Sequence, residues 1–342
     1  MVWSVLSDCK AIGDIQAARR FNPEVRANLE GYSDEEILAS VLSIANGDNR
    51  AEAAEVEDPR IAEFKLLANG SRSWNRTSRR RFGASPAMAS VHRLREVACL
   101  YGFTRFEPAP LANEDLEDVG LAVNGAALGQ NPEWLPAVEQ FGEGFFIRFS
   151  SEALAQWLVR PAVLERAQQL QAGATAWIEA KRARGMAVSA NVLNERERPE
   201  YIMAHSLAHA LMTEVAIDCG YPASALKERI YLLPRLPGQP IQCGILIYTA
   251  SAGNQGTLGG LVEITHRFAK VLKSALERER LCSGDPVCAD HDPVTADDDR
   301  MLHGAACHGC LLISETSCEA RNVLLDRVLL VDTVGPTGAA YF

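Results

Sequence analysis

Apolar side chains recur at helical spacing through the first part of the chain. Residues 23–29 and the stretch after Ser33 place apolar residues three or four positions apart, which indicates amphipathic helices. Ser33 and Glu36 have the spacing of a capping box, so we expect a helix to begin at this point. A further short helix, IAEFKLLANG, is expected to end at Gly70. The pattern therefore predicts a helical N-terminal region.

The middle of the chain changes from a strand pattern to a helical one. The stretch GEGFFIRFS at 142–150 is a continuous apolar and aromatic run, which is typical of a buried strand. Helical periodicity follows, and Pro161 is expected to break it because proline lacks the backbone N–H that a helix interior needs. Either Ser150 or Ser151 is expected to cap the start of this helix.

From residue 199 onward, helices and strands alternate. PEYIMAHSLAHALMTEVAIDC predicts an apolar helix that ends at Gly220, and SALKERIYLLP predicts a helical turn and a strand. A strand over GILIYTA, a glycine-rich turn and a helix over EITHRFAKVLKSALERERL follow. The last apolar segment, ARNVLLDRVLLVD, predicts a helix or a strand. Interleaved helices with few strands favour a helix-rich α+β (mixed α/β) fold.

These patterns divide the chain into three expected parts. Residues 1–90 form a helical N-terminal region with an arginine-rich arm, and residues 91–198 form a mixed α/β region. Residues 199–342 form a C-terminal domain that carries a cysteine-rich module. A chain of 342 residues is long enough to bury a substantial core and to divide in this way.

The composition of the chain indicates where in the cell the protein is found and which kinds of partner it can bind. With 47% hydrophobic and 23% charged residues, the sequence has an ordinary globular composition. No apolar run has the length of a membrane span, and the first residues lack the layout of a signal peptide. We therefore expect a cytoplasmic protein with reduced thiols and no membrane contact. A formal charge of −10 argues against a protein that coats nucleic acid over its whole surface.

One stretch departs from this acidic composition. SRSWNRTSRRRF, at 71–82, interleaves its arginines with Trp74 and Phe82. Arginines contact phosphates and aromatic rings stack on bases, so the stretch predicts a nucleic-acid-binding arm. A solvated linker, or one that faces an acidic partner, would carry the same charges. The arginines of the predicted contact are Arg72, Arg76, Arg79, Arg80 and Arg81.

Five of the nine cysteines lie close together near the C-terminus. In a reducing compartment, clustered thiols favour a metal site over disulfides. A C-x2-C pair such as Cys307 and Cys310 supplies one edge of a tetrahedral zinc site, and four thiolates close the shell. The spacing therefore predicts one structural zinc ion (Zn). The candidate ligands are Cys282, Cys288, Cys307, Cys310 and Cys318.

Five thiols compete for four positions in such a site. We expect one of Cys282 and Cys288 to be spare, and three nearby histidines could substitute as ligands: His291, His303 and His308. Free thiols in a packed region are the alternative interpretation. A redox C-x2-C pair is disfavoured because the pair follows an acidic loop. The remaining cysteines are expected to be small buried hydrophobic residues: Cys9, Cys99, Cys219 and Cys243.

His205 and His209 lie four residues apart in HSLAH, on one face of the expected helix. This spacing can share a metal ion, but Ser206 occupies the position of the glutamate in H-E-x-x-H. A packed or hydrogen-bonding helix face is therefore the main expectation. A metal-dependent nuclease or hydrolase that uses the two histidines is the alternative function. Asp285 and Asp326 are expected to be caps and ion-pair partners, and no catalytic residue is assigned.

The glycines of TASAGNQGTLGGL lie between an expected strand and an expected helix. Such a turn can hold a phosphate, yet the stretch matches neither G-x-x-x-x-G-K-[ST] nor G-x-G-x-x-G. Close packing of the helix on the strand is the favoured interpretation, with phosphate binding as the alternative. Nucleotide hydrolysis by this chain is not supported.

The order of several motifs resembles a known family. HRLREV, GEGFFIRF, HSLAHAL, GILIYTASAGNQGTLGGLV, CSGDPVC and GAACHGCLLISETSCEARNVLLDR are similar to the DrmB subunits of the bacterial DISARM anti-phage system. The final third also resembles the zinc-binding domain of MrfA-type DNA-repair helicases. The resemblance runs from about His92 to the C-terminus and is dense over 199–331. Because members usually carry a longer N-terminal portion, this chain is expected to be a fragment, a split gene product or a shortened relative.

This resemblance implies a function. It implies a non-catalytic subunit that binds DNA together with a superfamily 2 helicase-like ATPase of the DrmA type and helps to restrict phage genomes. It also implies that residues 199–342 are a helicase-associated domain whose zinc ligands come from the five clustered cysteines, without indicating which four.

Overall fold

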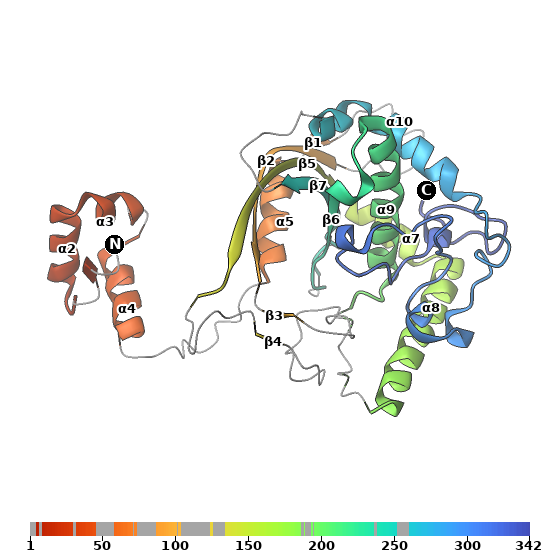
Figure 1. The fold of residues 1–342 in the computed structure, drawn as a ribbon, viewed down its shortest axis with the longest axis horizontal. Helices are drawn as coiled ribbons and strands as arrows, with labels where there is room; N and C mark the ends of the chain where they lie inside the picture. The colour runs from red at the N-terminus through yellow and green to blue at the C-terminus, as the bar shows by residue number, and fades with distance from the viewer. Residues whose placement is uncertain are drawn as a thin grey trace. The chain divides into compact units, whose positions relative to one another are not determined.

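The structure of the chain is a computed structural model. It describes residues 5–6, 9–29, 32–45, 58–70, 72–73, 87–100, 102–103, 124–125, 134–185, 188, 193, 195–235, 238–251 and 260–342. The chain divides into two compact units, Met1–Ala62 and Glu63–Phe342. Figure 1 labels the helices and strands of both units.

The described part of the first unit includes the helices α2 (Ile12–Phe21), α3 (Pro23–Asn28) and α4 (Asp34–Ala45). A small apolar cluster that includes Ile15, Val25 and Val41 holds them together. The predicted capping box is confirmed, because the Glu36 N–H donates to Ser33 Oγ and the Ser33 N–H donates to the Glu36 carboxylate. The helices predicted over residues 23–29 and after Ser33 are thus confirmed.

The second unit is built on a five-stranded antiparallel sheet in the order β1–β2–β5–β7–β6. These strands are β1 (Arg72–Ser73), β2 (Ala87–Cys99), β5 (Ala137–Arg148), β6 (Leu226–Leu232) and β7 (Cys243–Ser251). A separate two-stranded pair consists of β3 (Gly102–Phe103) and β4 (Asn124–Gly125).

Helices cover both faces of the sheet (Figure 1). Successive side chains of a strand point to opposite faces, and the two adjacent phenylalanines of β5 show this clearly. Phe145 packs against Phe268 of α10 (Gly260–Glu279), whereas Phe146 packs edge-on against Phe64 of α5 (Pro59–Gly70). On the α5 face, Arg229 of β6 also forms an ion pair of 2.6 Å with Glu63. The continuous apolar run in β5 is therefore explained by burial on both faces.

Three further helices complete the second unit. They are α7 (Ser151–Leu158), α8 (Pro161–Ala183) and α9 (Pro199–Cys219). The predicted break at Pro161 is confirmed, and Ser150 caps α7 by accepting a hydrogen bond of 3.3 Å from the Ala153 N–H. The helix α9 ends at Gly220, whose φ of 73° lies in the left-handed region that glycine favours.

The C-terminal segment lies largely in turns and short 3-10 helices. These are η2 (Pro293–Thr295), η3 (Asp298–Leu302), η4 (Glu315–Ser317) and η5 (Arg327–Leu329), after η1 (Ala223–Ala225) earlier in the unit. The prediction of a helix or strand over ARNVLLDRVLLVD is wrong, because within it the structure has only η5. Its apolar side chains are nevertheless buried, so their hydrophobicity reflects core packing and not a regular element.

The prediction of an α+β fold with a C-terminal cysteine cluster is confirmed. The domain boundaries at residues 90 and 198 stay predictions. Strands from both sides of residue 198 share one sheet, since β5 pairs with β7. Among the described residues, no helix has both the length and the hydrophobicity needed to cross a bilayer.

Candidate metal centres

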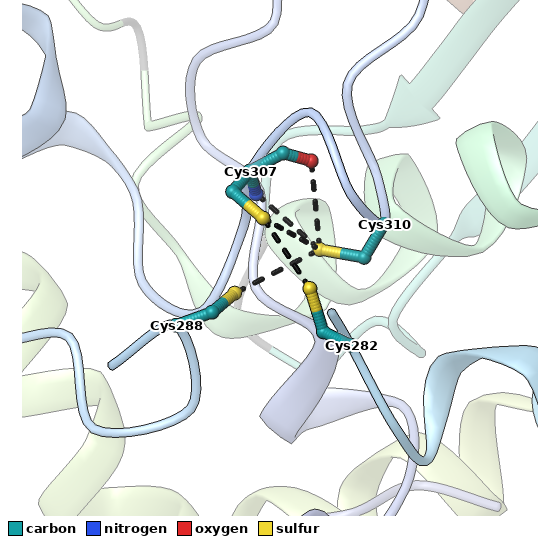
Figure 2. A group of neighbouring side chains, drawn as sticks. All are labelled: Cys282, Cys288, Cys307 and Cys310. Carbon is teal, nitrogen blue, oxygen red and sulfur yellow. Dashed lines mark hydrogen bonds between the residues drawn. The ribbon is translucent and has the colours of Figure 1, made fainter. Parts of the chain in front are cut away.

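Four of the clustered cysteines lie together, with their sulfur atoms facing one another (Figure 2). Cys282 and Cys288 come from the turns after α10, and Cys307 and Cys310 come from a later loop. The Sγ atoms all lie within 4.8 Å of one another, with Cys288–Cys310 and Cys307–Cys310 separations of 3.8 Å. A zinc tetrahedron with arms of about 2.3 Å has edges of about 3.8 Å. The four sulfur atoms therefore fit a zinc ion.

Backbone N–H groups point at these sulfur atoms. Gly284 donates to Cys282, Gly309 donates to Cys307 and Cys307 donates to Cys310, each over 3.3 Å. Such hydrogen bonds stabilise the thiolate form that binds metal. Gly309 is needed sterically, because a Cβ there would lie 2.5 Å from Ser283 Oγ and 3.2 Å from Cys282 Sγ.

A buried cation lies beside the four-cysteine group. Arg327 is 0% exposed, forms an ion pair with Asp285 and donates to the Glu279 carbonyl over 3.0 Å. A hydrogen bond from Cys310, helped by one from Arg327, lowers the pKa of Cys288 to about 5. A zinc ion held by four thiolates would carry a net charge of two minus, which the Arg327 guanidinium would partly offset.

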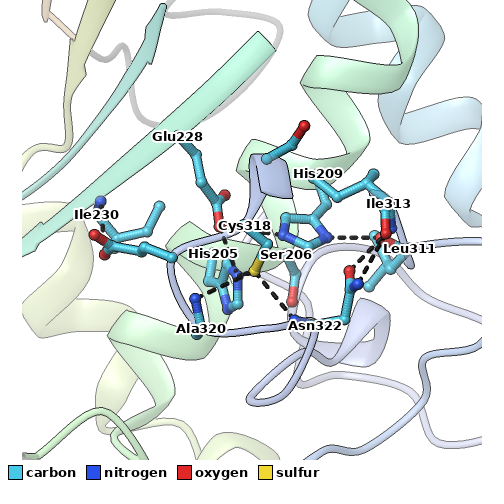
Figure 3. A network of polar contacts seen from close by, with 12 residues as sticks. His205, Ser206, His209, Glu228, Ile230, Leu311, Ile313, Cys318, Ala320 and Asn322 are labelled. Atoms are coloured by element: carbon cyan, nitrogen blue, oxygen red, sulfur yellow. Dashed lines mark hydrogen bonds and ion pairs between the residues drawn. The ribbon is translucent and has the colours of Figure 1, made fainter. Parts of the chain in front are cut away.

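Cys318 does not belong to the four-cysteine group. We expected one of Cys282 and Cys288 to be spare, but the structure groups both of them with Cys307 and Cys310. Cys318 belongs instead to a second group, formed with His205, His209 and Glu228 (Figure 3). The prediction that four of the five clustered cysteines can hold a metal ion is confirmed by this arrangement.

The second group draws on three separate parts of the fold. His205 and His209 project from α9, Glu228 comes from β6, and Cys318 comes directly after η4. The four side chains are buried, and their ligand atoms lie within 4.8 Å of one another. Glu228 Oε1 lies 2.9 Å from His205 Nε2 and 3.2 Å from His209 Nε2. The Cys318 Sγ atom lies 3.2 Å from His205 Nε2.

The charges in this second group depend on one another. When no metal ion is bound, burial lowers the pKa of His209, but the Glu228 carboxylate and a hydrogen bond with Cys318 together outweigh burial and raise that pKa to about 9. Burial raises the pKa of Glu228, yet His205 and His209 outweigh it and hold the carboxyl pKa well below its usual value. The carboxylate therefore stays ionised in a fully buried place.

Asp285 and Asp326 are ion-pair partners, as predicted. Asp326 forms a buried ion pair of 2.7 Å with Arg166 and caps η5 by accepting from the Val328 N–H. The backbone N–H of Asp326 donates to Ser206 Oγ over 2.7 Å, which ties the C-terminal segment to α9 between the two histidines. Ser206 thus has a structural contact at the position where a hydrolase motif would place glutamate.

The remaining predicted sites are described only in part. Of the five arginines, Arg72 contributes backbone to β1, and its side chain and the other four arginines lie outside the described residues. In the glycine-rich stretch, β7 ends at Ser251, Gly260 begins α10, and residues 252–259 lie outside the described part of the chain. His291 and His303 stack on each other with ring centroids 5.6 Å apart and belong to neither group of metal-ligating residues.

Glu228 is a residue that the sequence did not single out. It lies in KERIYLLP, where the alternation of polar and apolar residues indicates a strand and gives no sign of metal chemistry. Its nearest partners are 19 and 23 positions earlier on a helix, so their proximity follows from the packing of β6 against α9. No local spacing could have revealed this proximity.

Comparison with known proteins supports a zinc-binding domain. Residues 207–311 match the MrfA Zn-binding domain. All four residues of the cysteine group lie inside this range, whereas His205 and Cys318 lie outside it. The second unit is thus an α+β scaffold that carries a zinc-binding domain.

A particular relative is similar to most of the chain. The DISARM protein DrmB of Bacillus paralicheniformis (strain ATCC 9945a / NCIMB 11709 / CD-2) is 36% identical over 259 residues. The alignment covers 75% of this chain and 42% of the relative, so the matched part spans less than half the length of that protein. The resemblance predicted from the motifs is confirmed by both comparisons.

Proposed function

We propose that this chain acts as a DrmB-type subunit of a DISARM-type phage-defence system. The observation that carries the proposal is the 36% identity to DrmB over three quarters of the chain, together with the MrfA Zn-binding domain match. In this role the chain is a non-catalytic DNA-binding and scaffolding subunit. Its partner is a superfamily 2 helicase-like ATPase of the DrmA type.

The four-cysteine group serves this function as a structural element. Its thiolates would hold zinc with a closed coordination shell, so that the ion supplies folding energy to the C-terminal loops and takes no part in a reaction. Cys282 and Cys288 would be joined to Cys307 and Cys310, which would fix two loops that contain few regular elements. A rigid surface of this kind suits a binding and scaffolding role.

The arginine-rich arm supplies the proposed contact with DNA. Arg79, Arg80 and Arg81 are consecutive in a chain with a formal charge of −10, so phosphate binding would be local. Because the ATP-binding motifs are lacking from this sequence, the energy for movement along DNA would come from the partner chain.

The first experiment measures DNA binding and partner binding together. The chain is purified alone and with the helicase-like subunit encoded beside it, and DNA affinity is measured from low to high salt. We expect a stable complex and an affinity that falls steeply with salt. The triple variant Arg79→Ala, Arg80→Ala, Arg81→Ala should reduce the slope of log affinity against log salt by about 3, since each phosphate contact contributes about 0.9.

A matched control replaces exposed arginines outside the arm. Arg182→Ala and Arg184→Ala remove positive charge from the end of α8 and should leave the salt slope unchanged. An unchanged affinity and slope in the arm variant would remove the arm from the proposal. Failure to associate with the helicase-like subunit would refute the scaffolding role.

The alternative of a metal-dependent nuclease or hydrolase loses support from the burial of its residues. His205 and His209 are 0% exposed, so a substrate could not reach a metal ion between them without unpacking α9. A catalytic metal site keeps an open coordination position, which this group does not offer. DNA cleavage that depends on added metal and is lost in His209→Ala would restore the alternative.

A further inference from the structure

We propose that His205, His209, Glu228 and Cys318 form a second zinc site, closed and structural, in addition to the four-cysteine site. The zinc-domain match does not assign it, because that match begins after His205 and ends before Cys318. The ligand types suit zinc, which takes histidine nitrogen, cysteine sulfur and carboxylate oxygen in tetrahedral sites.

The two histidines are oriented by their outer nitrogen atoms. His205 Nδ1 lies 3.1 Å from the Leu324 carbonyl oxygen, and His209 Nδ1 lies 2.7 Å from the Leu311 carbonyl oxygen. A carbonyl can only accept a hydrogen bond, so each Nδ1 carries a proton and donates it. The Nε2 atoms then present lone pairs to the interior of the group (Figure 3). This is the arrangement in which histidine ligates metals.

Without a metal ion, the His209 lone pair would face a carboxylate, and the His205 lone pair would depend on a weak hydrogen bond from the Cys318 thiol, 3.2 Å away. Each Nε2 atom faces Oε1 of Glu228, and an ionised carboxylate offers no proton. Protonating both rings would supply the hydrogen bonds, but it would place two buried positive charges side by side, with ring centroids 4.5 Å apart. A Zn²⁺ ion with one carboxylate and one thiolate gives a neutral group and keeps both imidazoles neutral.

The carboxylate also has an atom that lacks a hydrogen bond. Among the described atoms, Glu228 Oε2 is buried and has no hydrogen-bond partner, although the side chain is 0% exposed. A buried carboxylate oxygen without a partner is costly, and such an orphan requires an explanation. An ion bound to this carboxylate provides one.

The backbone around Cys318 is shaped to hold a thiolate. The N–H groups of Ala320 and Asn322 donate to Cys318 Sγ over 3.3 Å and 3.2 Å. Arg321 and Asn322 have φ values of 51° and 60°, in the left-handed region that is unfavourable for residues other than glycine. The Asn322 side chain fixes this bend by bonding the N–H and carbonyl of Ile313. The loop thus wraps its donors around the sulfur atom, as the four-cysteine group does.

The site would join three parts of the core. Its ligands come from α9, from β6 and from the loop after η4, and each is buried. All four coordination positions of a tetrahedral ion would be filled by protein, which excludes a substrate position and defines a structural site. A zinc ion here would therefore lock the C-terminal segment onto the helix and sheet.

The test is the zinc content of the full-length chain after purification from zinc-supplemented cells, with the variants Glu228→Gln and Cys318→Ser. We expect two zinc ions per chain, falling to one in either variant. Glu228→Gln keeps the shape and removes the charge, and Cys318→Ser keeps a polar atom and removes the soft ligand. One zinc ion in the unaltered chain, or two in both variants, would overturn the proposal.

A matched control and a second measurement keep the test decisive. Cys243→Ser makes the same change at a 0% exposed thiol in β7 outside both groups, and it should retain two zinc ions. If the variants fail to fold, zinc X-ray absorption of the unaltered chain decides the matter. Histidine scattering beside sulfur is expected, and a shell of sulfur alone would contradict the second site.

Discussion

The four-cysteine group and the His205–His209–Glu228–Cys318 group lie in one unit but arise in different ways. The cysteines all lie between Cys282 and Cys310, and two of them form a C-x2-C pair. The second group draws its ligands from α9, β6 and a loop more than a hundred positions further along the chain than His205. Local spacing builds the first group and tertiary packing builds the second.

The two groups also differ in their surroundings. Cys307 and Cys310 are half-buried and their loops contain little regular structure, so zinc would supply order that packing does not. His205 and His209 lie on a helix that is buried along most of its length. Loss of the first ion should therefore loosen loops, whereas loss of the second would disturb the core itself.

The largest expected effect comes from Cys310→Ser. It removes a ligand of the four-cysteine group, and structural zinc sites contribute on the order of 10 kcal/mol of apparent binding energy. We expect the loss of one zinc ion per chain. Because a bound ion stabilises the folded state, its loss should also lower the melting temperature by about ten degrees or more. Atomic absorption and calorimetry measure both.

The control for this prediction is Cys99→Ser. The expectation that Cys99 is buried is wrong, because its thiol is exposed on β2, and it lies outside both groups. The change should alter neither zinc content nor melting temperature. If Cys310→Ser retained all its zinc, the four-cysteine group would not be the local site described here.

The next largest effect comes from breaking the buried ion pair between Arg166 and Asp326. Asp326→Asn leaves Arg166 as an uncompensated buried cation and weakens the cap of η5, which should destabilise the fold by about 3–5 kcal/mol. Denaturant unfolding measures this change. Zinc content should stay at the unaltered value, because Asp326 ligates neither group. Equal stability of the unaltered chain and the Asp326→Asn variant would show that the ion pair does not stabilise the fold.

A smaller effect is a gain in stability, expected when Glu279 is replaced. Glu279 is 1% exposed, and burial raises its carboxyl pKa to about 7. A raised folded-state pKa contributes stability that is present below pH 4.5 and is lost as pH rises to about 7. Glu279→Gln removes this loss and should stabilise the protein above pH 7 by up to about 3 kcal/mol, at about 1.4 kcal/mol per pKa unit.

Melting temperatures of the two proteins at pH 5 and pH 8 check this sign. The variant should gain more at pH 8 than at pH 5. A constant difference would mean that the buried carboxyl does not titrate in this window.

The smallest effect comes from a helix cap that lies outside both groups of metal-ligating residues. Ser150→Ala removes the oxygen that caps α7 and should cost about 1 kcal/mol. The melting temperature should fall by a few degrees, as about 1 kcal/mol gives in a unit of this size, while both zinc ions remain. Loss of zinc in this variant would mean that metal content reports general stability and not ligand removal.

Much of the fold followed from the sequence. The capping box at Ser33, the break at Pro161 and the end of α9 at Gly220 were predictable because each depends on the backbone chemistry of a few adjacent residues. A metal site that includes Cys307 and Cys310 was predictable for the same reason, since one turn sets the C-x2-C spacing. The spacing did not predict that both Cys282 and Cys288 would join them.

Tertiary structure decided what local spacing leaves open. It placed Cys318 apart from the other four clustered cysteines, brought Glu228 to the two histidines and left ARNVLLDRVLLVD mainly in turns. In each case the partners are far apart in sequence, and the packing of helix, strand and loop determines which side chains meet. The sequence by itself therefore determined that the clustered cysteines can hold a metal ion, whereas the tertiary structure decided which four of them meet. The packing of α9 against β6 decided the second group.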